Sequence, residues 1–383
     1  MEQGSAAFIR LKPERFTFVG VFRSIFRKIV WKTFPGIFLP TPDGVAAKFL
    51  EDHDLPALAF AIAKGGTIVL SQGFGLTGER RSEPVTGDSL FRIASNSKAI
   101  TAAAIHVLAD RGKLALNDRV FGNSGILGTT FGTKPYSNWL TQIEVRHLLE
   151  HSAGGWGSDD KDPMFLPPHL DHAALISATL DADLLQRPPG VQFIYSNFGF
   201  CVLGRVIERV TDQSYEDFVR RSVLAAAGAN GMRIGQDTLA ARAPGEVVYV
   251  STGSSPYDLP VRRMDSHGGW IASAADYVRF LIAIDGSGTP PDVVAAGSVT
   301  AMRTPSTAAD AGNYGQGVGT NGTDIWHNGA LPGTRSVMWG GTGGDAWCVI
   351  CTGGPPPGAK KKKKGDPLLE ALDKMMWRLW DLV

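Results

Sequence analysis

Two groups of strand-like segments, one near each end of the chain, constrain the fold more than any other feature of the sequence. Near the N-terminus, "ALAFAIAKGGTIVLSQGFG" predicts two strands that are joined by a hairpin turn at Gly65-Gly66. Near the C-terminus, glycine-containing turns separate the runs "TDIWHNG", "TRSVMWGG" and "DAWCVICTGG". The segments between the two groups are mostly helical in pattern, so we expect the early and late strands to join in one antiparallel sheet.

Helices are predicted at both ends of this arrangement and in the middle. A short helix precedes the first strand, and "DPLLEALDKMMWRLWDLV" closes the chain with Asp366 as N-cap and Pro367 as its first residue. After residue 244 we also expect a strand at "GEVVYVS" and a helix at Ile271 to Ile284. The predicted class is α/β (α+β): an antiparallel sheet flanked by N- and C-terminal helices, with an inserted, mostly helical domain.

The predicted boundaries follow from this pattern. Residues 1–41 form a basic, aromatic extension, and residues 42–383 form the main domain. Its α/β part takes in 42–95 and 245–383, and its helical part takes in 96–244. Within the extension, residues 16–34 have the spacing of a basic amphipathic helix, which could lie on a membrane surface or pack on the body of the protein. The sequence leaves the oligomeric state and the compartment open, and it favours a cytoplasmic or peripherally membrane-associated protein.

Composition excludes several classes of function. The net charge is +1, and no basic stripe with aromatic residues lies outside the N-terminus, so we expect no nucleic-acid partner. Three cysteines do not make a disulfide framework. Cys348 and Cys351 lie three residues apart on a predicted strand and should point to opposite faces, and no second pair completes a zinc site. The run Lys360–Lys364 is typical of a solvated loop, with a partner-binding segment as the alternative.

The stretch "RIASNSKAI" contains Ser95 and Lys98 with S-x-x-K spacing. We expect it to open a helix, so that the two side chains lie one turn apart on the same face. A serine hydroxyl becomes a good nucleophile when a neighbouring base takes its proton, and a buried lysine can do this because burial lowers its pKa. The alternative is a helix-capping serine beside a surface lysine.

The triplet Tyr-Ser-Asn occurs twice, at Tyr136 and at Tyr195. Tyr195 follows a Pro-Pro-Gly turn and precedes an amphipathic helix, so its backbone is held at a junction. Tyr136 lies in a polar loop with nothing to hold it. A catalytic phenol needs a fixed position, which favours Tyr195, with a buried core tyrosine as the alternative.

The pattern His-x-Gly also occurs twice, at His267 and at His327. His327 and Gly329 belong to a strand-like run, and glycine allows a substrate to approach such a strand closely. His267 leads into a predicted helix and does not fit this role.

Taken together in this order, the three motifs resemble the serine β-lactamase and penicillin-binding-protein superfamily, in particular its class C β-lactamase-like branch of esterases, D-amino-acid-specific peptidases and acyltransferases. The resemblance covers about residues 42–383 and includes "LLEHSAGG", "PPGVQFIYSNFGFCVLGRVIE" and "HNGALPGTRSVMWGG". It implies an acylated nucleophile at Ser95, a proton-sharing Lys98, and Tyr195 as general base and as acid to the leaving group. It implies that Asn197 binds a substrate amide or holds Lys98, and that the backbone N–H groups of Ser95 and Ala330 form the oxyanion hole.

The chain departs from the resemblance at the third motif. Where true β-lactamases usually carry Lys-Thr-Gly, this chain has His327, which is mostly neutral at pH 7. We therefore expect a carboxylesterase-like serine hydrolase of small esters or amides that needs no metal or organic cofactor. A D-stereospecific peptidase or β-lactamase, an acyltransferase, and a non-catalytic scaffold or filament protein of the same fold stay open. Asp159, Asp160 and Asp162 are expected in a loop, solvated or bordering the pocket, and His151 is expected to support the site.

Overall fold

The structure is a computed structural model that describes residues 40–159, 162–165, 167, 169–354 and 366–383. The basic aromatic segment 16–34, Asp160 and the run Lys360–Lys364 lie outside the described residues. Within the described part, no helix combines the length and the apolar character needed to cross a membrane.

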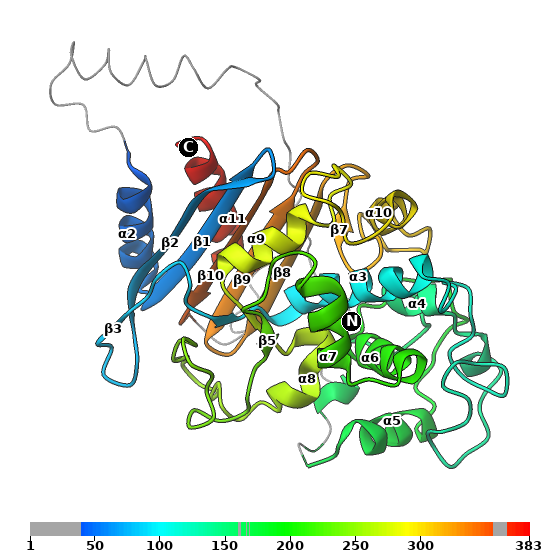
Figure 1. Cartoon of the computed structure of the whole chain (residues 1–383). Helices are drawn as coiled ribbons and strands as arrows, with labels where there is room; N and C mark the ends of the chain where they lie inside the picture. Colours follow the sequence, from blue (N-terminus) through cyan, green and yellow to red (C-terminus); the bar gives the residue numbers. More distant parts are fainter. Residues whose placement is uncertain (1–39, 160–161, 166, 168, 355–365) are drawn as a thin grey trace, which may run out of the picture.

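One seven-stranded antiparallel sheet forms the centre of the molecule, as expected (Figure 1). Its strand order is β3-β2-β1-β10-β9-β8-β7, so the early hairpin pairs with the late strands through β1 and β10. The strands are β1 (Ala57–Lys64), β2 (Thr67–Thr77), β3 (Glu83–Pro84), β7 (Gly319–Thr320), β8 (Ile325–Leu331), β9 (Thr334–Gly340) and β10 (Ala346–Thr352). A smaller sheet contains β4 (Phe91–Arg92), β6 (Trp270–Ala272) and β5 (Arg233–Ile234).

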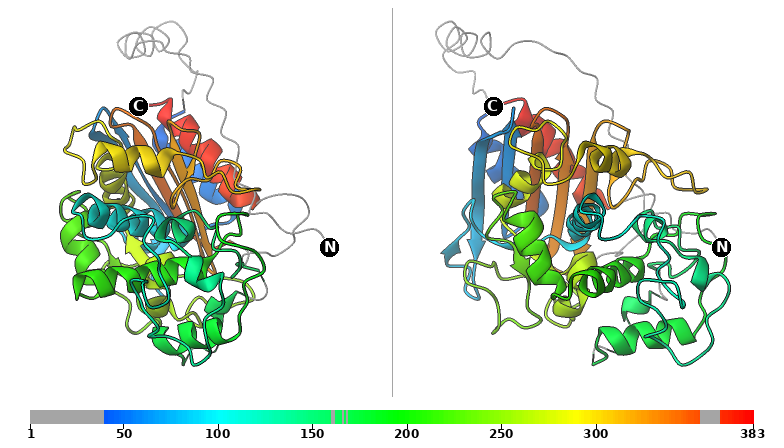
Figure 2. Two further views of the ribbon diagram at one scale, coloured as in Figure 1. Left: turned by 90° about the vertical axis from the view of Figure 1, so that its right-hand side faces the viewer. Right: turned by 45° about the vertical axis from the view of Figure 1, so that its right-hand side comes forward.

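The terminal helices α2 (Pro42–His53) and α11 (Pro367–Trp380) cover one face of the large sheet, and α9 (Ala274–Ile282) covers the other (Figure 2). The predicted cap of α11 is confirmed, because the Asp366 side chain accepts a hydrogen bond from the N–H of Leu368. Strand β1 alternates small alanines toward α9 with larger side chains toward α2 and α11. Cys348 and Cys351 on β10 belong to the two opposite cores, which confirms the expected orientation.

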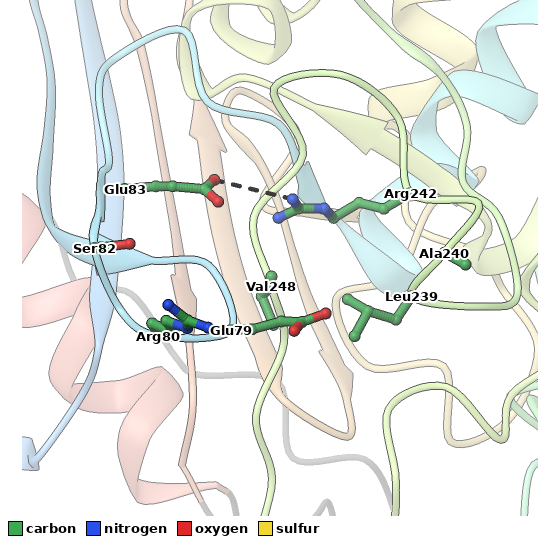
Figure 3. A pocket seen from close by; sticks show the side chains of 8 residues that line it. All are labelled: Glu79, Arg80, Ser82, Glu83, Leu239, Ala240, Arg242 and Val248. Atoms are coloured by element: carbon green, nitrogen blue, oxygen red, sulfur yellow. Dashed lines mark ion pairs between the residues drawn. The ribbon is translucent and has the colours of Figure 1, made fainter.

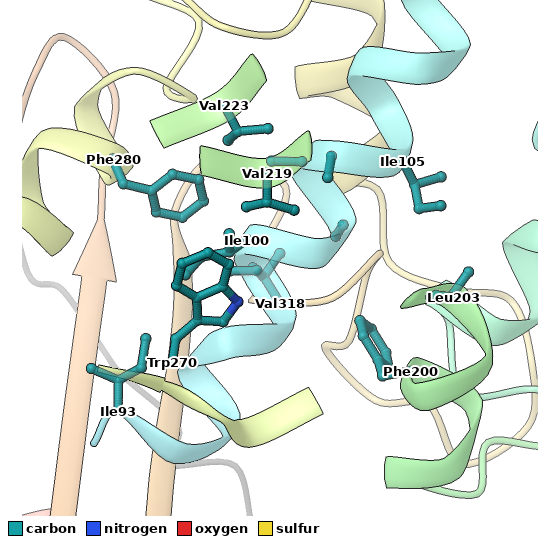
Figure 4. Close-up of a cluster of buried hydrophobic side chains, with 14 of the residues drawn as sticks. Ile93, Ile100, Ile105, Phe200, Leu203, Val219, Val223, Trp270, Phe280 and Val318 are labelled. Atoms are coloured by element: carbon teal, nitrogen blue, oxygen red, sulfur yellow. The ribbon is translucent and has the colours of Figure 1, made fainter. Parts of the chain in front are cut away.

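The other helices gather beside the α9 face of the sheet. They are α3 (Ser97–Asp110), α4 (Val145–Leu149), α5 (His172–Asp181), α6 (Asn197–Thr211), α7 (Tyr215–Val219), α8 (Val261–Gly268) and α10 (Ala296–Arg303). Short 3-10 turns are η1 (Ala94–Asn96), η2 (Leu140–Gln142) and η3 (Pro163–Phe165), and η4 (Arg220–Leu224) is a π-helical turn after α7. A continuous apolar core joins them to the sheet: Figure 4 shows Trp270 packed with Ile100 of α3, Val219 of α7 and Phe280 of α9. The buried helix α3 is therefore held in position against β6, α7 and α9.

Three sequence expectations for this region were wrong. The run "GEVVYVS" forms no strand: only Glu246 makes an isolated bridge, to Leu90. The expected helix at 271–284 begins later, because Trp270–Ala272 pairs as β6, and the helix α8 before it was not anticipated. Ser95 lies in the short turn η1, two residues before α3 begins at Ser97.

Candidate active site

The segment that carries Ser95 is held rigidly by contacts on both sides. The N–H of Ile93 donates to the Trp270 carbonyl (3.0 Å), and the carbonyl of Ile93 accepts from Ser336 Oγ (2.7 Å). The Tyr277 hydroxyl donates to the carbonyl of Asn96 (2.7 Å). These bonds bracket Ala94, whose φ of 51° is unfavourable for a residue with a side chain. The strained turn is maintained by its surroundings and leaves Ser95 half-exposed between buried neighbours.

Three oxygen atoms surround the amine of Lys98, and they determine the direction in which the lone pair of the neutral amine points. Its Nζ lies 2.8 Å from Asn197 Oδ1, 2.9 Å from the carbonyl oxygen of His267 and 3.2 Å from Ser95 Oγ. The amide and carbonyl oxygens can only accept, so they occupy the two N–H groups of a neutral amine. The lone pair then faces the hydroxyl of Ser95, which is the one partner of the three that can donate. Neutral Lys98 is thus oriented to take the proton of Ser95.

Burial makes this neutral form accessible near physiological pH. Lys98 is fully buried, and the loss of hydration lowers the pKa of its ammonium from 10.5 to about 7, while the carboxylate of Asp162 acts in the opposite direction. An uncharged Lys98 is therefore accessible at neutral pH, which an exposed lysine is not.

Asp162 continues the chain of polar contacts behind Asn197. Its Oδ2 accepts from Asn197 Nδ2 at 2.8 Å, and its Oδ1 accepts from the N–H of Met164 at 2.9 Å. The side chain is only 4% exposed, and burial raises the pKa of the Asp162 carboxyl. The expectation of a solvated aspartate is therefore wrong for Asp162, whereas Asp159 is exposed.

Tyr195 lies on the other side of the nucleophile. Its hydroxyl shares a hydrogen bond with the side chain of Ser95, and Lys98 Nζ lies 4.9 Å from the centre of its ring. Burial raises the pKa of the Tyr195 phenol, and the hydrogen bond to Ser95 only partly opposes this. The phenol therefore keeps its proton at neutral pH.

His151 packs against Tyr195 and supports its backbone. The ring centres of the two residues lie 4.3 Å apart. The His151 Nδ1 accepts from the N–H of Ser196 (3.1 Å), so that its Nε2 carries the proton and bonds the Tyr314 hydroxyl (3.0 Å). Burial, followed by the nearby charge of Lys98, lowers the pKa of His151 well below its usual value. His151 is thus a neutral structural support.

Strand β8 brings the third motif next to η1. A side chain at Gly329 would overlap the carbonyl oxygen of Ile93 and lie 3.0 Å from Ala94 Cβ, so the two backbones touch at this glycine. Ala330 is the next residue on the strand. His327 is buried, and burial, followed by the charge of Lys98, lowers its pKa to about 3. A neutral His327 offers no positive charge to a substrate carboxylate.

The other copies of the two repeated motifs, at Tyr136 and at His267, do not contribute side-chain hydrogen bonds to the cluster around Ser95. The expectation that nothing holds Tyr136 was wrong: its hydroxyl donates to the carbonyl of Phe131 (2.5 Å), and its ring packs against Phe121. Tyr136 nevertheless lies apart from Ser95 and lines a separate pocket of about 490 Å³. His267 was expected to be a bystander, but its backbone carbonyl is a partner of Lys98. Another pocket, of about 480 Å³, has a charged lining that includes the ion pair of Arg242 and Glu83 (3.9 Å) and none of the candidate catalytic residues (Figure 3).

Sequence reasoning thus named Ser95, Lys98, Tyr195 and Asn197, which the structure brings into mutual contact. It did not anticipate the contacts of Asp162 with Asn197 and of the His267 carbonyl with Lys98. The only local signal for Asp162 is the apolar Pro163-Met164-Phe165 that follows it. No cluster of potential metal ligands occurs among the described residues.

A family model described as Beta-lactamase matches residues 43–371. The chain belongs to the beta-lactamase family. This match confirms the resemblance, and it covers the sheet, the helices and the cluster around Ser95.

Individual relatives agree with the family. Penicillin-binding protein 4* of Bacillus subtilis is 28% identical over 248 residues, which are 62% of this chain and 50% of that protein. The chain thus spans about half the length of this curated relative. The structure of a D-amino acid amidase from Ochrobactrum anthropi SV3 superposes with a TM-score of 0.69 at 21% identity, over 90% of this chain and 100% of that one. The structure of EstCE1, which is described as a hydrolase with promiscuous acyltransferase activity, superposes with a TM-score of 0.67 at 17% identity. The superposition covers 82% of this chain and 92% of that one. At these identities, the two structures establish the fold alone.

Proposed function

We propose that this member of the beta-lactamase family is a serine hydrolase that cleaves small ester or amide substrates through an acyl-enzyme on Ser95. The observation that supports it most is the environment of Lys98. A buried amine with a pKa of about 7 has two obligate acceptors on its N–H groups and the Ser95 hydroxyl at its lone pair. This arrangement activates a serine without any further base.

The proposed acylation uses these groups in sequence. Neutral Lys98 takes the proton of Ser95, and Ser95 Oγ attacks the substrate carbonyl carbon. The N–H groups of Ser95 and Ala330 stabilise the oxyanion, which commonly contributes several kcal/mol per donor. Tyr195 gives its phenolic proton to the departing alcohol or amine and recovers a proton from Lys98. Water then attacks the acyl-enzyme by the same steps, with neutral Lys98 as the proton acceptor.

This assignment gives the first proton transfer to Lys98, whereas the family resemblance suggested Tyr195. The reason is the difference in pKa: burial lowers that of Lys98 and raises that of Tyr195. Tyr195 is then the acid for the leaving group.

The proposed substrates lack a carboxylate at the position that the third motif would recognise. His327 is buried and uncharged, so it cannot attract such a group in the way that a lysine does. We therefore place carboxylesterase-like activity before penicillin hydrolysis.

The test compares hydrolysis of p-nitrophenyl butyrate by the wild type and by Ser95→Ala. We expect turnover by the wild type and background rates for the variant. Faster turnover of nitrocefin or of D-alanyl amides would favour the peptidase or β-lactamase alternative. Transfer to an added alcohol in preference to water would favour an acyltransferase. A folded wild type that hydrolyses none of these substrates and resists a fluorophosphonate probe would refute the proposal and favour a non-catalytic scaffold.

A further inference from the structure

A buried carboxylate lies directly behind the amide that contacts Lys98. Asp162 Oδ2 accepts from Asn197 Nδ2, while Asn197 Oδ1 accepts from Lys98 Nζ, both at 2.8 Å. The second oxygen of Asp162 is occupied by the N–H of Met164, and Ser158 also donates to this carboxylate. Burial of a carboxylate is unfavourable unless it is well paired. Its presence here calls for a role in this chain of contacts.

We propose that Asp162 is a positioning residue, whose carboxylate holds the Asn197 amide in the one orientation that presents Oδ1 to Lys98. A carboxylate can only accept, so it selects the NH₂ end of the amide. In the flipped orientation, Asn197 Nδ2 would face the amine of Lys98, and Oδ1 would face the carboxylate. Without Asp162 the terminal torsion of asparagine is broad and roughly two-fold, so both orientations become populated. The lone pair of Lys98 then loses its fixed direction toward Ser95.

Asp162 has a second effect on Lys98, through its charge. The titratable side chains that face Lys98 come from five segments: Asp162 before η3, His151 after α4, Tyr195 before α6, His267 in α8 and His327 in β8. Burial keeps the three histidines neutral and Tyr195 protonated. Among the described residues, Asp162 is therefore the one ionised group acting on Lys98, and it favours the ammonium form.

Two substitutions separate orientation from charge. Asp162→Asn removes the charge and keeps one acceptor oxygen for Asn197, with loss of the bond from the N–H of Met164, whereas Asp162→Leu removes the charge and both acceptors. Asp159→Asn is the matched control, because it removes an exposed carboxylate from the same loop. Because the inference rests on the proposed function, kcat/KM for p-nitrophenyl butyrate against pH is the main readout.

We expect the acid limb of the wild-type profile near the Lys98 pKa of about 7. In Asp162→Asn it should move to lower pH by on the order of half a unit or more, with kcat within a few-fold. In Asp162→Leu, kcat should fall by about tenfold or more. Profiles of both variants that coincide with that of Asp159→Asn would overturn the inference. If neither variant folds, Ser158→Ala, at an exposed position that bonds Asp162, should give a smaller shift in the same direction, and its absence would count against the inference.

A second measurement does not need turnover. The titration of Lys98 can be followed by NMR in ¹³C-lysine-labelled protein, with Lys98→Met to assign the signal. Its midpoint should be lower in Asp162→Asn than in the wild type, and equal midpoints would overturn the role of the charge. If the wild type proved to have no hydrolase activity, the proposed function would fail, while this titration would still decide whether the charge of Asp162 acts on Lys98.

Discussion

Replacing Gly329 by alanine should disturb the contact between strand β8 and the segment that carries the nucleophile. The new Cβ would overlap the carbonyl oxygen of Ile93 and lie 2.5 Å from Ser336 Oγ and 3.0 Å from Ala94 Cβ. These atoms cannot easily retreat, because Ser336 Oγ donates to Ile93, and the N–H of Ile93 donates to Trp270. The strand must therefore move away from Ser95.

The size of this movement sets the expected effect. The closest clash is with the carbonyl oxygen of Ile93 in the segment that carries Ser95, and the new methyl must move by about 1 Å to turn this overlap into an ordinary contact of 3.4 Å. A misplacement of about 1 Å in a catalytic group can lower the rate by about 100-fold, or about 2.7 kcal/mol. Overpacking of this kind also costs about 1–3 kcal/mol of folding free energy. We therefore expect kcat/KM to fall by about two orders of magnitude, with a lower Tm.

The assay is p-nitrophenyl butyrate hydrolysis together with thermal unfolding. Gly297→Ala in α10 is the control, because its Cβ would meet nothing within 4 Å and its φ is not in the left-handed region. The control should keep full activity and gain up to about 1 kcal/mol of stability. A folded Gly329→Ala protein with wild-type kcat/KM would refute the assignment of this part of β8 to the oxyanion hole.

Two further predictions concern single titratable groups. Lys98→Arg should lower kcat about 1,000-fold or more, because a guanidinium stays charged and cannot accept the proton of Ser95; wild-type-like turnover by this variant would exclude Lys98 as the acceptor. Burial raises the pKa of Asp373 in α11 to about 6, above its value near 3.9 in the unfolded chain. The folded protein therefore binds this proton more tightly than the unfolded chain, and the resulting stability is present below about pH 4 and is lost as the pH rises through about 6. Asp373→Asn should therefore raise the free energy of unfolding by about 3 kcal/mol at pH 8 and leave it nearly unchanged near pH 4, as measured by urea denaturation. Equal gains at both pH values would contradict this reasoning.

The sheet could be predicted because its signals are local. The Gly65-Gly66 turn and the glycine-separated late strands indicate hairpins, and Asp366-Pro367 indicates the start of α11. The run "GEVVYVS" has a strand-like composition, yet its backbone is irregular. Side chains of other segments bind this backbone: the N–H of Val248, for example, donates to the hydroxyl of Thr77. Composition alone does not reveal such contacts.

Only the part of the candidate site that has a local sequence signal could be predicted. Motif spacing identifies Ser95 and Lys98, whose separation along the chain is short. Polar residues typical of a solvated loop precede Asp162, and the apolar residues after it are a weak signal, so its burial becomes evident only from the tertiary contact with Asn197. The His267 carbonyl is a backbone atom, so no side-chain pattern could indicate it.

The proposed chemistry requires acylation of Ser95 by way of a neutral Lys98. The most direct test is the rate of fluorophosphonate labelling, followed by intact-protein mass spectrometry from pH 5 to pH 9 (roughly two units on either side of the Lys98 pKa). We predict a single adduct on Ser95, absent in Ser95→Ala, whose rate of formation rises with pH through about 7. A folded wild type that forms no adduct, or a rate that does not change across this range, would contradict the account.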